Sequence, residues 1–284
     1  MVGKIEISGF ADEIAEDLNK QIEVIKKLGI SYIEMRGVNG KPLVEYSLEE
    51  VKEIKKQLDK NGIRLSSIGS PIGKINITED FEAHFELYKK TVEIAKIMET
   101  PFIRMFSFFL PSGEEPEIYK RQVFERLERF VDYAEQENVI LLHENEKDIY
   151  GDNVKRCLEI MEQFSNKHFK AVFDFANFVQ CHQDTEEAYK LLKPYIAYVH
   201  IKDAKMDSGT VVPAGYGDGH IEEILDDLLQ NGYDGFLSLE PHLADFTGFA
   251  ALEQNGEKKE HKMSGEEAYT TAYNALRKIL SRLQ

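Results

Sequence analysis

VILLHENEKDIYGD, residues 139–152, joins an apolar run to carboxylates that follow it immediately. The apolar part has the length and composition of a buried β-strand, and it ends at Glu144, with Glu146 close behind. Moving an unpaired carboxylate into an apolar environment costs several kcal/mol. We therefore expect Glu144 to meet a positively charged partner at the end of this strand.

Apolar runs of similar length, rich in Ile, Val and Phe, recur along the whole chain and predict eight strands. The eight are residues 4–8, 31–35, 64–68, 101–106, 139–144, 170–175, 197–202 and 235–240. Amphipathic segments lie between them, with apolar residues three and four positions apart. Examples are residues 17–29, 47–62 and 222–232. The chain therefore alternates strands with helices.

Local signals support the predicted helix ends. Ser47 and Glu50 match a capping box at a helix start. Glycines stand where a helix end favours a left-handed residue, namely Gly29, Gly62 and Gly232.

Strands that alternate with helices pair in parallel through right-handed crossovers, and eight such units predict a closed (β/α)8 TIM barrel. No linker or change of composition divides residues 1–284, so we expect a single domain. An open doubly wound sheet is the alternative. Its Gly-rich dinucleotide turn should follow the first strand, but SGFADE, residues 8–13, has one glycine.

Composition restricts the partners. The net charge of −16 disfavours binding to nucleic acid or to an anionic membrane. Cys157 and Cys181 match no metal spacing, which predicts free thiols in a reducing compartment. The N-terminal residues do not resemble a signal peptide and no apolar run is long enough to span a membrane, so we expect a cytoplasmic protein. A homo-oligomer is compatible with the sequence.

Four of the predicted strands deliver metal-ligand side chains to their carboxyl ends, where TIM barrels carry their chemistry. These are Glu144, Asp174, His200 and Glu240. Three carboxylates and an imidazole at one rim would be stabilised by a divalent metal. Oxygen-rich ligation favours Mn²⁺, with Mg²⁺, Zn²⁺ or Co²⁺ as alternatives.

Nearby titratable residues receive simpler interpretations. Glu146 lies one pleat beyond Glu144 and is expected to be outside the ligand set, as an outer-shell or solvated side chain. His143 has the opposite parity and should point toward the helices as a buried, hydrogen-bonded histidine. The carboxylates Asp12, Glu13 and Glu34 are expected to be caps or solvated side chains.

Several short motifs extend this picture. They are Glu144–Asn145, DFAN at 174–177, HIKD at 200–203, GYGDG at 215–219 and LEPH at 239–242. With these motifs the chain resembles, over nearly its whole length, the sugar phosphate isomerase/epimerase family. These are xylose isomerase-like barrels that include ketose 3-epimerases, hydroxypyruvate isomerase and inosose dehydratase.

The resemblance implies that the four strand-end residues bind one divalent metal and that Glu144 and Glu240 also transfer protons on opposite faces of a small carbohydrate. Metal chelation of a ketose carbonyl and its neighbouring hydroxyl would let one carboxylate remove a proton, giving a cis-enediolate. Reprotonation of the same carbon gives epimerisation, and reprotonation of the adjoining carbon gives aldose–ketose isomerisation. The segment 242–263 is expected to act as a lid, with Phe246 or Phe249 facing the substrate.

Further substrate contacts are expected from Asn177, Lys202, His242 and Arg104. Asn177 stands where epimerases of the family often have a histidine, and it can donate to a hydroxyl but cannot carry a proton. Lys202 is expected to hold substrate oxygens, and His242 a hydroxyl or phosphate.

Alternatives stay open at several positions. Asp203 is expected to make an outer-shell bond, although Lys202 and Asp203 could simply pair with each other. A phosphate would need cationic donors, which Arg36, Arg104, Lys74 and Lys202 could supply, or the amides of 215–219. Ordinary salt bridging explains the same cations equally well, so the sequence leaves phosphorylation of the substrate undecided.

Two other reactions compete with isomerisation. A dehydratase of a polyol-derived or dehydroshikimate-like substrate could use the same metal and base to expel hydroxide. An abasic-site endonuclease is less favoured, since SSIGSPIG (66–73) and RMFSFF (104–109) lack the additional histidines that its metal cluster needs.

Overall fold

The structure is a computed structural model that describes residues 4–244 and 263–283. The proposed lid, residues 242–263 with Phe246 and Phe249, therefore lies almost wholly outside the described residues. Within the described ranges, no helix has the length and apolar character needed to cross a membrane.

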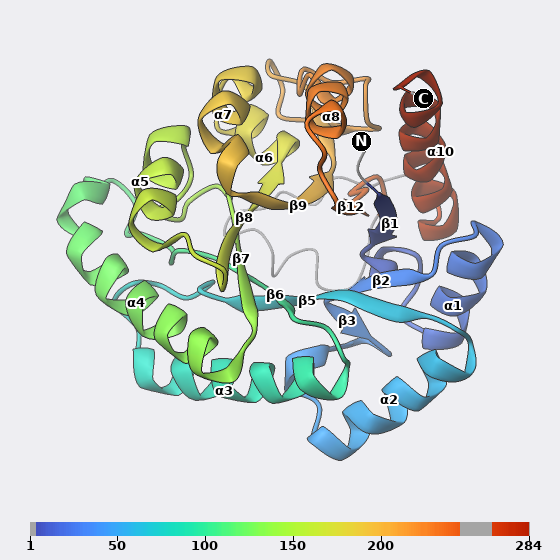
Figure 1. Cartoon of the computed structure of the whole chain (residues 1–284), viewed down its shortest axis with the longest axis horizontal. Helices are drawn as coiled ribbons and strands as arrows, with labels where there is room; N and C mark the ends of the chain where they lie inside the picture. The colour runs from blue at the N-terminus through green and yellow to red at the C-terminus, as the bar shows by residue number, and fades with distance from the viewer. Residues whose placement is uncertain (1–3, 245–262, 284) are drawn as a thin grey trace.

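Eight parallel strands surround a central axis, and helices cover their outer side (Figure 1). In chain order the strands are β1 (Ile5–Gly9), β2 (Tyr32–Met35), β5 (Arg64–Ile72), β6 (Phe102–Met105), β7 (Ile140–Glu144), β8 (Phe169–Asp174), β9 (Ile196–Ile201) and β12 (Gly235–Leu239). Hydrogen bonds join them in the order β1-β12-β9-β8-β7-β6-β5-β2. A parallel bridge between Phe10 and Glu34 links the two ends of this sheet, so the predicted (β/α)8 barrel is confirmed.

The helices follow the strands as the amphipathic pattern predicts. They are α1 (Leu18–Lys27), α2 (Leu48–Lys60), α3 (Phe81–Ile97), α4 (Lys120–Glu137), α5 (Val154–Phe164), α6 (Phe175–Gln180), α7 (Thr185–Leu192), α8 (Ile221–Gln230) and α10 (Gly265–Leu283), with short 3-10 turns η1 (Ala11–Glu13), η2 (Leu43–Glu45), η3 (Pro116–Ile118) and η4 (Lys193–Tyr195). The capping box is present at the start of α2, where the Ser47 and Glu50 side chains each accept the other's backbone N–H. The three predicted glycines all have positive φ.

Two short antiparallel hairpins were not predicted. They are β3 (Gly37–Val38) with β4 (Lys41–Pro42), and β10 (Asp203–Ala204) with β11 (Val211–Val212). Both hairpins lie in loops that follow barrel strands, the first after β2 and the second after β9. Their two-residue strands are too short to show a hydrophobic period.

The barrel interior is apolar at one end. Leu142, Val172 and Tyr198 pack together there, with Phe102 and Phe236 against them. Since alternate residues of a strand point to the same side, the inward position of Leu142 also places Glu144 inside the barrel. The larger apolar core lies between the strands and the surrounding helices.

Replacing Ser47 by Ala should lower the free energy of unfolding by about 1 kcal/mol, because the first turn of α2 would lose its side-chain acceptor. Urea denaturation monitored by circular dichroism would measure the change. Ser281→Ala, at an exposed position in the last turns of α10, is the matched control. Equal effects of the two substitutions would contradict the capping role.

Candidate metal centre

The four side chains predicted as metal ligands converge at the carboxyl end of the barrel. Glu144 ends β7, Asp174 ends β8, His200 lies in β9, and Glu240 directly follows β12. One ligand atom of each lies within 4.8 Å of the others, and all four residues are buried. The register places Asp174 directly beside His200, so the sheet itself sets part of this spacing.

His200 contacts all three carboxylates through one ring nitrogen. Its Nδ1 atom is 2.8 Å from Glu144 Oε1, 3.6 Å from Glu240 Oε2 and 3.8 Å from Asp174 Oδ2. Burial alone would lower the pKa of His200, but the charges of Glu144 and Glu34 raise it well above its ordinary value. The protonated ring thus supplies positive charge to the cluster of carboxylates.

The Asp174 carboxylate is only half satisfied. Its Oδ1 atom accepts the backbone N–H of Asn177 at 2.8 Å, whereas Oδ2 accepts no hydrogen bond from any described residue. Burial raises the pKa of Asp174 to about 7, even though the Lys202 ammonium acts in the opposite direction. A buried carboxylate oxygen that shares the Lys202 ammonium with Glu240, beside two other carboxylates and an imidazole, fits a divalent cation. The cluster could therefore hold a metal.

Two cations stabilise the glutamates. Arg104 Nη1 lies 3.1 Å from Glu144 Oε2, and Lys202 Nζ lies 2.9 Å from Glu240 Oε2 and 3.2 Å from Asp174 Oδ2. Burial alone would raise the pKa of Glu144, but His200 and Arg104 lower it to about 2. Burial also opposes ionisation of Glu240, but Lys202 and His242 hold its pKa well below the ordinary value. Both glutamates are therefore ionised at neutral pH.

The prediction that Glu13 and Glu34 are caps or solvated side chains is wrong. Glu34 is fully buried, and its Oε2 atom lies 3.1 Å from His200 Nε2 and accepts a 2.6 Å hydrogen bond from Ser238 Oγ. Glu13 is also buried and accepts the backbone N–H of His242 at 2.7 Å. The sequence did carry a signal for the burial of Glu34. It is a single charged residue inside the apolar run 31–35, whereas an exposed strand face would carry more polar residues.

Arg36 occupies the side of the cluster nearest η1. It donates to Asp12 Oδ2 at 2.8 Å, and its other guanidinium nitrogens lie 3.3 Å from Glu13 Oε1 and 3.5 Å from Glu240 Oε1. Burial would lower the pKa of Arg36, but Asp12 and Glu13 raise it above its ordinary value. Arg36 is therefore a counter-ion of the buried carboxylates.

Asp203 anchors the loop that precedes α8. Its carboxylate accepts the backbone N–H groups of Gly215 and Gly217 at 2.9 Å and of Gly219 at 3.0 Å. A Cβ atom on Gly217 would lie 2.1 Å from Asp203 Oδ1, so this close approach requires glycine. Asp203 therefore does not pair with Lys202. The idea that the 215–219 amides receive a substrate phosphate is wrong, because Asp203 already occupies them.

A pocket opens above the cluster. Its lining includes Lys74, Glu146, Lys147, Asn177, Gln180, Lys202, Glu240 and His242. Glu146 lies at this level, outside the ligand cluster, and pairs with Lys74 at 3.0 Å. Asn177 Nδ2 donates to the carbonyl of Asn145 at 2.9 Å. Three of the predicted substrate-binding residues thus line one pocket.

The positions of His242 and Arg104 differ in detail from those that the sequence predicts. The inward parity expected for His242 does not apply, because β12 ends at Leu239 and His242 has a left-handed φ of 46°. Its ring nevertheless reaches the cluster, with Nε2 3.3 Å from Glu240 Oε1. Arg104 is buried beneath the mouth against Glu144, and it is absent from the residues that line the pocket.

His143 is buried outside the barrel, as its parity predicts, with its ring 6.2 Å from that of Phe169. The expected hydrogen bond is not found at Nε2, which has no partner among the described residues. Burial lowers the pKa of His143 to about 4, so the ring is neutral at physiological pH. Cys157 and Cys181 are both free thiols, as predicted.

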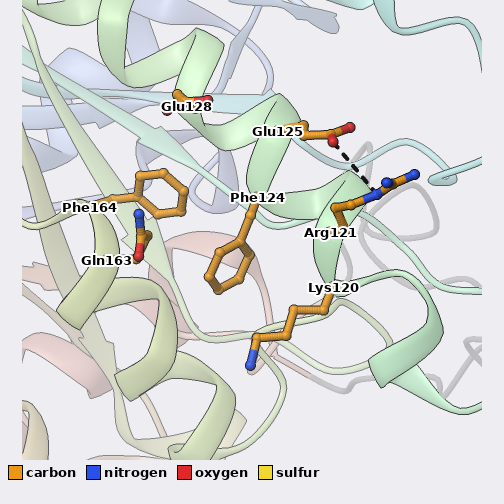
Figure 2. A pocket seen from close by; sticks show the side chains of 7 residues that line it. All are labelled: Lys120, Arg121, Phe124, Glu125, Glu128, Gln163 and Phe164. Carbon is orange, nitrogen blue, oxygen red and sulfur yellow. Dashed lines mark ion pairs between the residues drawn. The ribbon is translucent and has the colours of Figure 1, made fainter.

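A second cleft, of about 240 Å³, lies between α4 and α5 (Figure 2). Phe124 and Phe164 form its apolar part, and an ion pair between Arg121 and Glu125 lies at its edge. None of the four clustered residues lines it. The pocket above the cluster is therefore the better candidate site.

Active sites of TIM barrels lie at the carboxyl ends of their strands, so this fold and this cluster define a TIM-barrel protein with a candidate metal centre. The sequence matches the family model described as Xylose isomerase-like TIM barrel over residues 22–278, and the chain belongs to this family. No curated protein sequence matches it significantly.

Solved structures share the fold at low sequence identity. The probable 3-DHS dehydratase AsbF of Bacillus anthracis is 18% identical with a TM-score of 0.73, covering 96% of this chain and 98% of that one. The IOLI protein with a bound zinc atom is 18% identical with a TM-score of 0.76, covering 98% and 99%. A D-tagatose 3-epimerase-like protein is 16% identical with a TM-score of 0.72, covering 98% and 100%.

Replacing Asp203 by Asn should lower the free energy of unfolding by about 1–3 kcal/mol, because buried amides of the 215–219 loop would lose acceptors. Chemical denaturation would measure this loss. Asp207→Asn, at an exposed position of the following turn, is the control and should change stability little. A similar loss in both variants would argue against the anchoring role.

Proposed function

We propose that the protein is a divalent-metal-dependent sugar isomerase or epimerase that transfers protons through a cis-enediolate. The observation that carries this proposal is the convergence of Glu144, Asp174, His200 and Glu240 below a polar pocket. Two of these residues are glutamates, and an ionised carboxylate such as that of Glu144 can accept a proton.

The four clustered side chains would hold the metal, with Mn²⁺ as first choice and Mg²⁺, Zn²⁺ or Co²⁺ as alternatives. The structure of the IOLI protein, which has the same fold, contains a bound zinc atom, and this supports the proposal of a metal centre. When bound, the cation would polarise the carbonyl and the adjacent hydroxyl of a ketose.

The protein's own groups would carry the proton transfer. Glu144 would take the proton from the carbon next to the carbonyl. Glu240 would deliver a proton from the opposite face of the substrate, after taking one up from solvent or from a substrate hydroxyl. Arg104 and Lys202 keep the two carboxylates ionised and fixed in place. Asn177, Lys202 and His242 line the pocket and would bind substrate oxygens.

An unphosphorylated substrate suits this pocket better than a sugar phosphate. Lys74 pairs with Glu146, and Lys202 with Glu240 and Asp174, so these cations are already neutralised. The amides of the 215–219 loop are held by Asp203. A neutral polyol can bind by exchanging hydrogen bonds, whereas a phosphate would have to compete with buried carboxylates for the same donors.

Dehydration is the second candidate reaction, favoured by the likeness to the probable 3-DHS dehydratase AsbF. The same base would remove the proton, and a hydroxyl group would leave instead of a second proton returning. Products separate the two reactions, because only dehydration loses water. The endonuclease alternative is disfavoured because the net charge of −16 opposes binding of a nucleic acid.

Metal binding tests the centre directly. Isothermal titration of the purified, chelator-treated protein with Mn²⁺ should give one site per chain, and Asp174→Asn should weaken it strongly because a charged ligand is lost. Glu146→Gln is the matched control, since Glu146 lies in the pocket but outside the ligand cluster. Absence of binding in the wild type, or equal binding in Asp174→Asn, would overturn the assignment.

Solvent deuterium tests the paired glutamates. Glu240→Gln keeps an oxygen for the metal but removes the proton-transfer group, so turnover of a ketose should fall by about 10²–10⁴ while metal stays bound. Glu144 alone should still exchange the proton on its own face, giving deuterium uptake in D₂O without inversion for at least one epimer. Mass spectrometry and NMR of ketoses, their phosphates and dehydroshikimate would identify substrate and reaction. Near-normal inversion in both single glutamate variants would rule out the mechanism.

A further inference from the structure

Glu34 is a buried carboxylate beside the candidate centre that lies outside the four-ligand set. It lies in β2, and its backbone forms the bridge to Phe10 that closes the barrel. Its Oε2 atom is held between His200 Nε2 at 3.1 Å and Ser238 Oγ at 2.6 Å. Its Oε1 atom has no hydrogen-bond partner among the described residues. The side chain is therefore committed to His200 and Ser238.

This contact decides which ring nitrogen of His200 faces the cluster. Nδ1 points toward Glu144 at 2.8 Å, and Nε2 points toward Glu34. A neutral imidazole carries one proton, and a carboxylate accepts hydrogen bonds but cannot donate one. In this structure both ring nitrogens face carboxylates, so the protonated ring can donate from each of them. Binding of a cation by Nδ1 would require this nitrogen to give up its proton, and the proton on Nε2 would then be kept by its hydrogen bond to Glu34.

The orientation of the His200 imidazole is restricted by its neighbours. Phe10 packs edge-on against His200 at 5.3 Å between ring centroids, and Tyr198 does so at 5.8 Å from another side. A 180° flip of the imidazole would put carbon atoms in place of Nδ1 and Nε2 and lose the hydrogen bonds to both Glu144 and Glu34. These two contacts thus fix the orientation of the ring, and Glu34 holds the proton on Nε2.

We propose that Glu34 is a positioning residue that holds His200 as the Nε2–H tautomer with Nδ1 directed at the metal. This inference rests on the proposed function, because it concerns a ligand of the proposed centre. Glu34 is not among the residues that line the pocket, and it contacts the cluster through His200.

The test combines metal affinity with the tautomer itself. Zn²⁺ is titrated into the chelator-treated wild type, Glu34→Gln and Glu34→Ala, with competition by a chelator to reach tight affinities. Glu34→Ala should weaken binding by about 10–100-fold, the usual loss for an outer partner of a ligating histidine, and Glu34→Gln should lose less because an acceptor oxygen remains.

Ser66→Ala is the matched control. Ser66 is buried in the same barrel interior, where it hydrogen-bonds Ser8 at 2.6 Å and Tyr198 at 2.8 Å. Its loss perturbs the interior without removing the partner of His200, so zinc affinity should stay within about twofold of the wild type, well short of the loss for an outer partner.

The second readout is the ¹⁵N NMR spectrum of the zinc-loaded protein with labelled histidines. His200 should carry its proton on Nε2 in the wild type and show a shifted Nε2 resonance in Glu34→Gln. A merely structural role would lower stability but leave zinc affinity and the His200 tautomer of the folded protein unchanged. That result would overturn the proposal, and Glu34→Gln keeps the test decisive if Glu34→Ala does not fold.

The outcomes also separate this inference from the proposed function. If the wild type binds no zinc, the metal centre fails and the role of Glu34 fails with it. If the wild type binds zinc and both Glu34 variants bind equally well with His200 unchanged, the centre stands and only the role of Glu34 is wrong.

Discussion

Burial of several carboxylates within a few ångströms of one another is the constraint on which the mouth of this barrel depends. Glu144, Asp174 and Glu240 lie close enough to repel strongly, and solvent does not screen them. Arg104 and Lys202 offset part of this repulsion. Burial raises the pKa of Asp174, and the neighbouring glutamates act in the same direction, so an added divalent cation would favour its ionised form.

The barrel supplies the rigidity that such a cluster needs. Parallel register places Asp174, His200 and Ser238 in one row across β8, β9 and β12. Glu34 of β2 and Ser238 of β12 then meet inside the barrel, past the intervening strand β1. Because neighbouring strands are fixed by backbone hydrogen bonds, the distances between these side chains change little with movements of the loops.

The loops at the rim complete the arrangement with charge and backbone contacts. Asp203 accepts backbone N–H groups of the 215–219 loop. These hydrogen bonds fix the chain just after β9, where Lys202 lies. Glu13 accepts the backbone N–H of His242, which fixes the chain just beyond Glu240. These contacts restrict Lys202 and His242, which extend the cluster into the pocket.

The sequence by itself determined the order of the barrel strands and the helices between them, the inward side of β7 and the four strand-end residues that converge. Those properties follow from local alternation of apolar and polar residues, and from the rule that parallel strands end at one rim. Only the tertiary structure decided how the charges pair. Glu34 meets Ser238 from 204 positions away, and Asp203 takes amides that the motif alone offered to a phosphate. Such partners depend on barrel closure and loop paths, and no local period in the sequence encodes them.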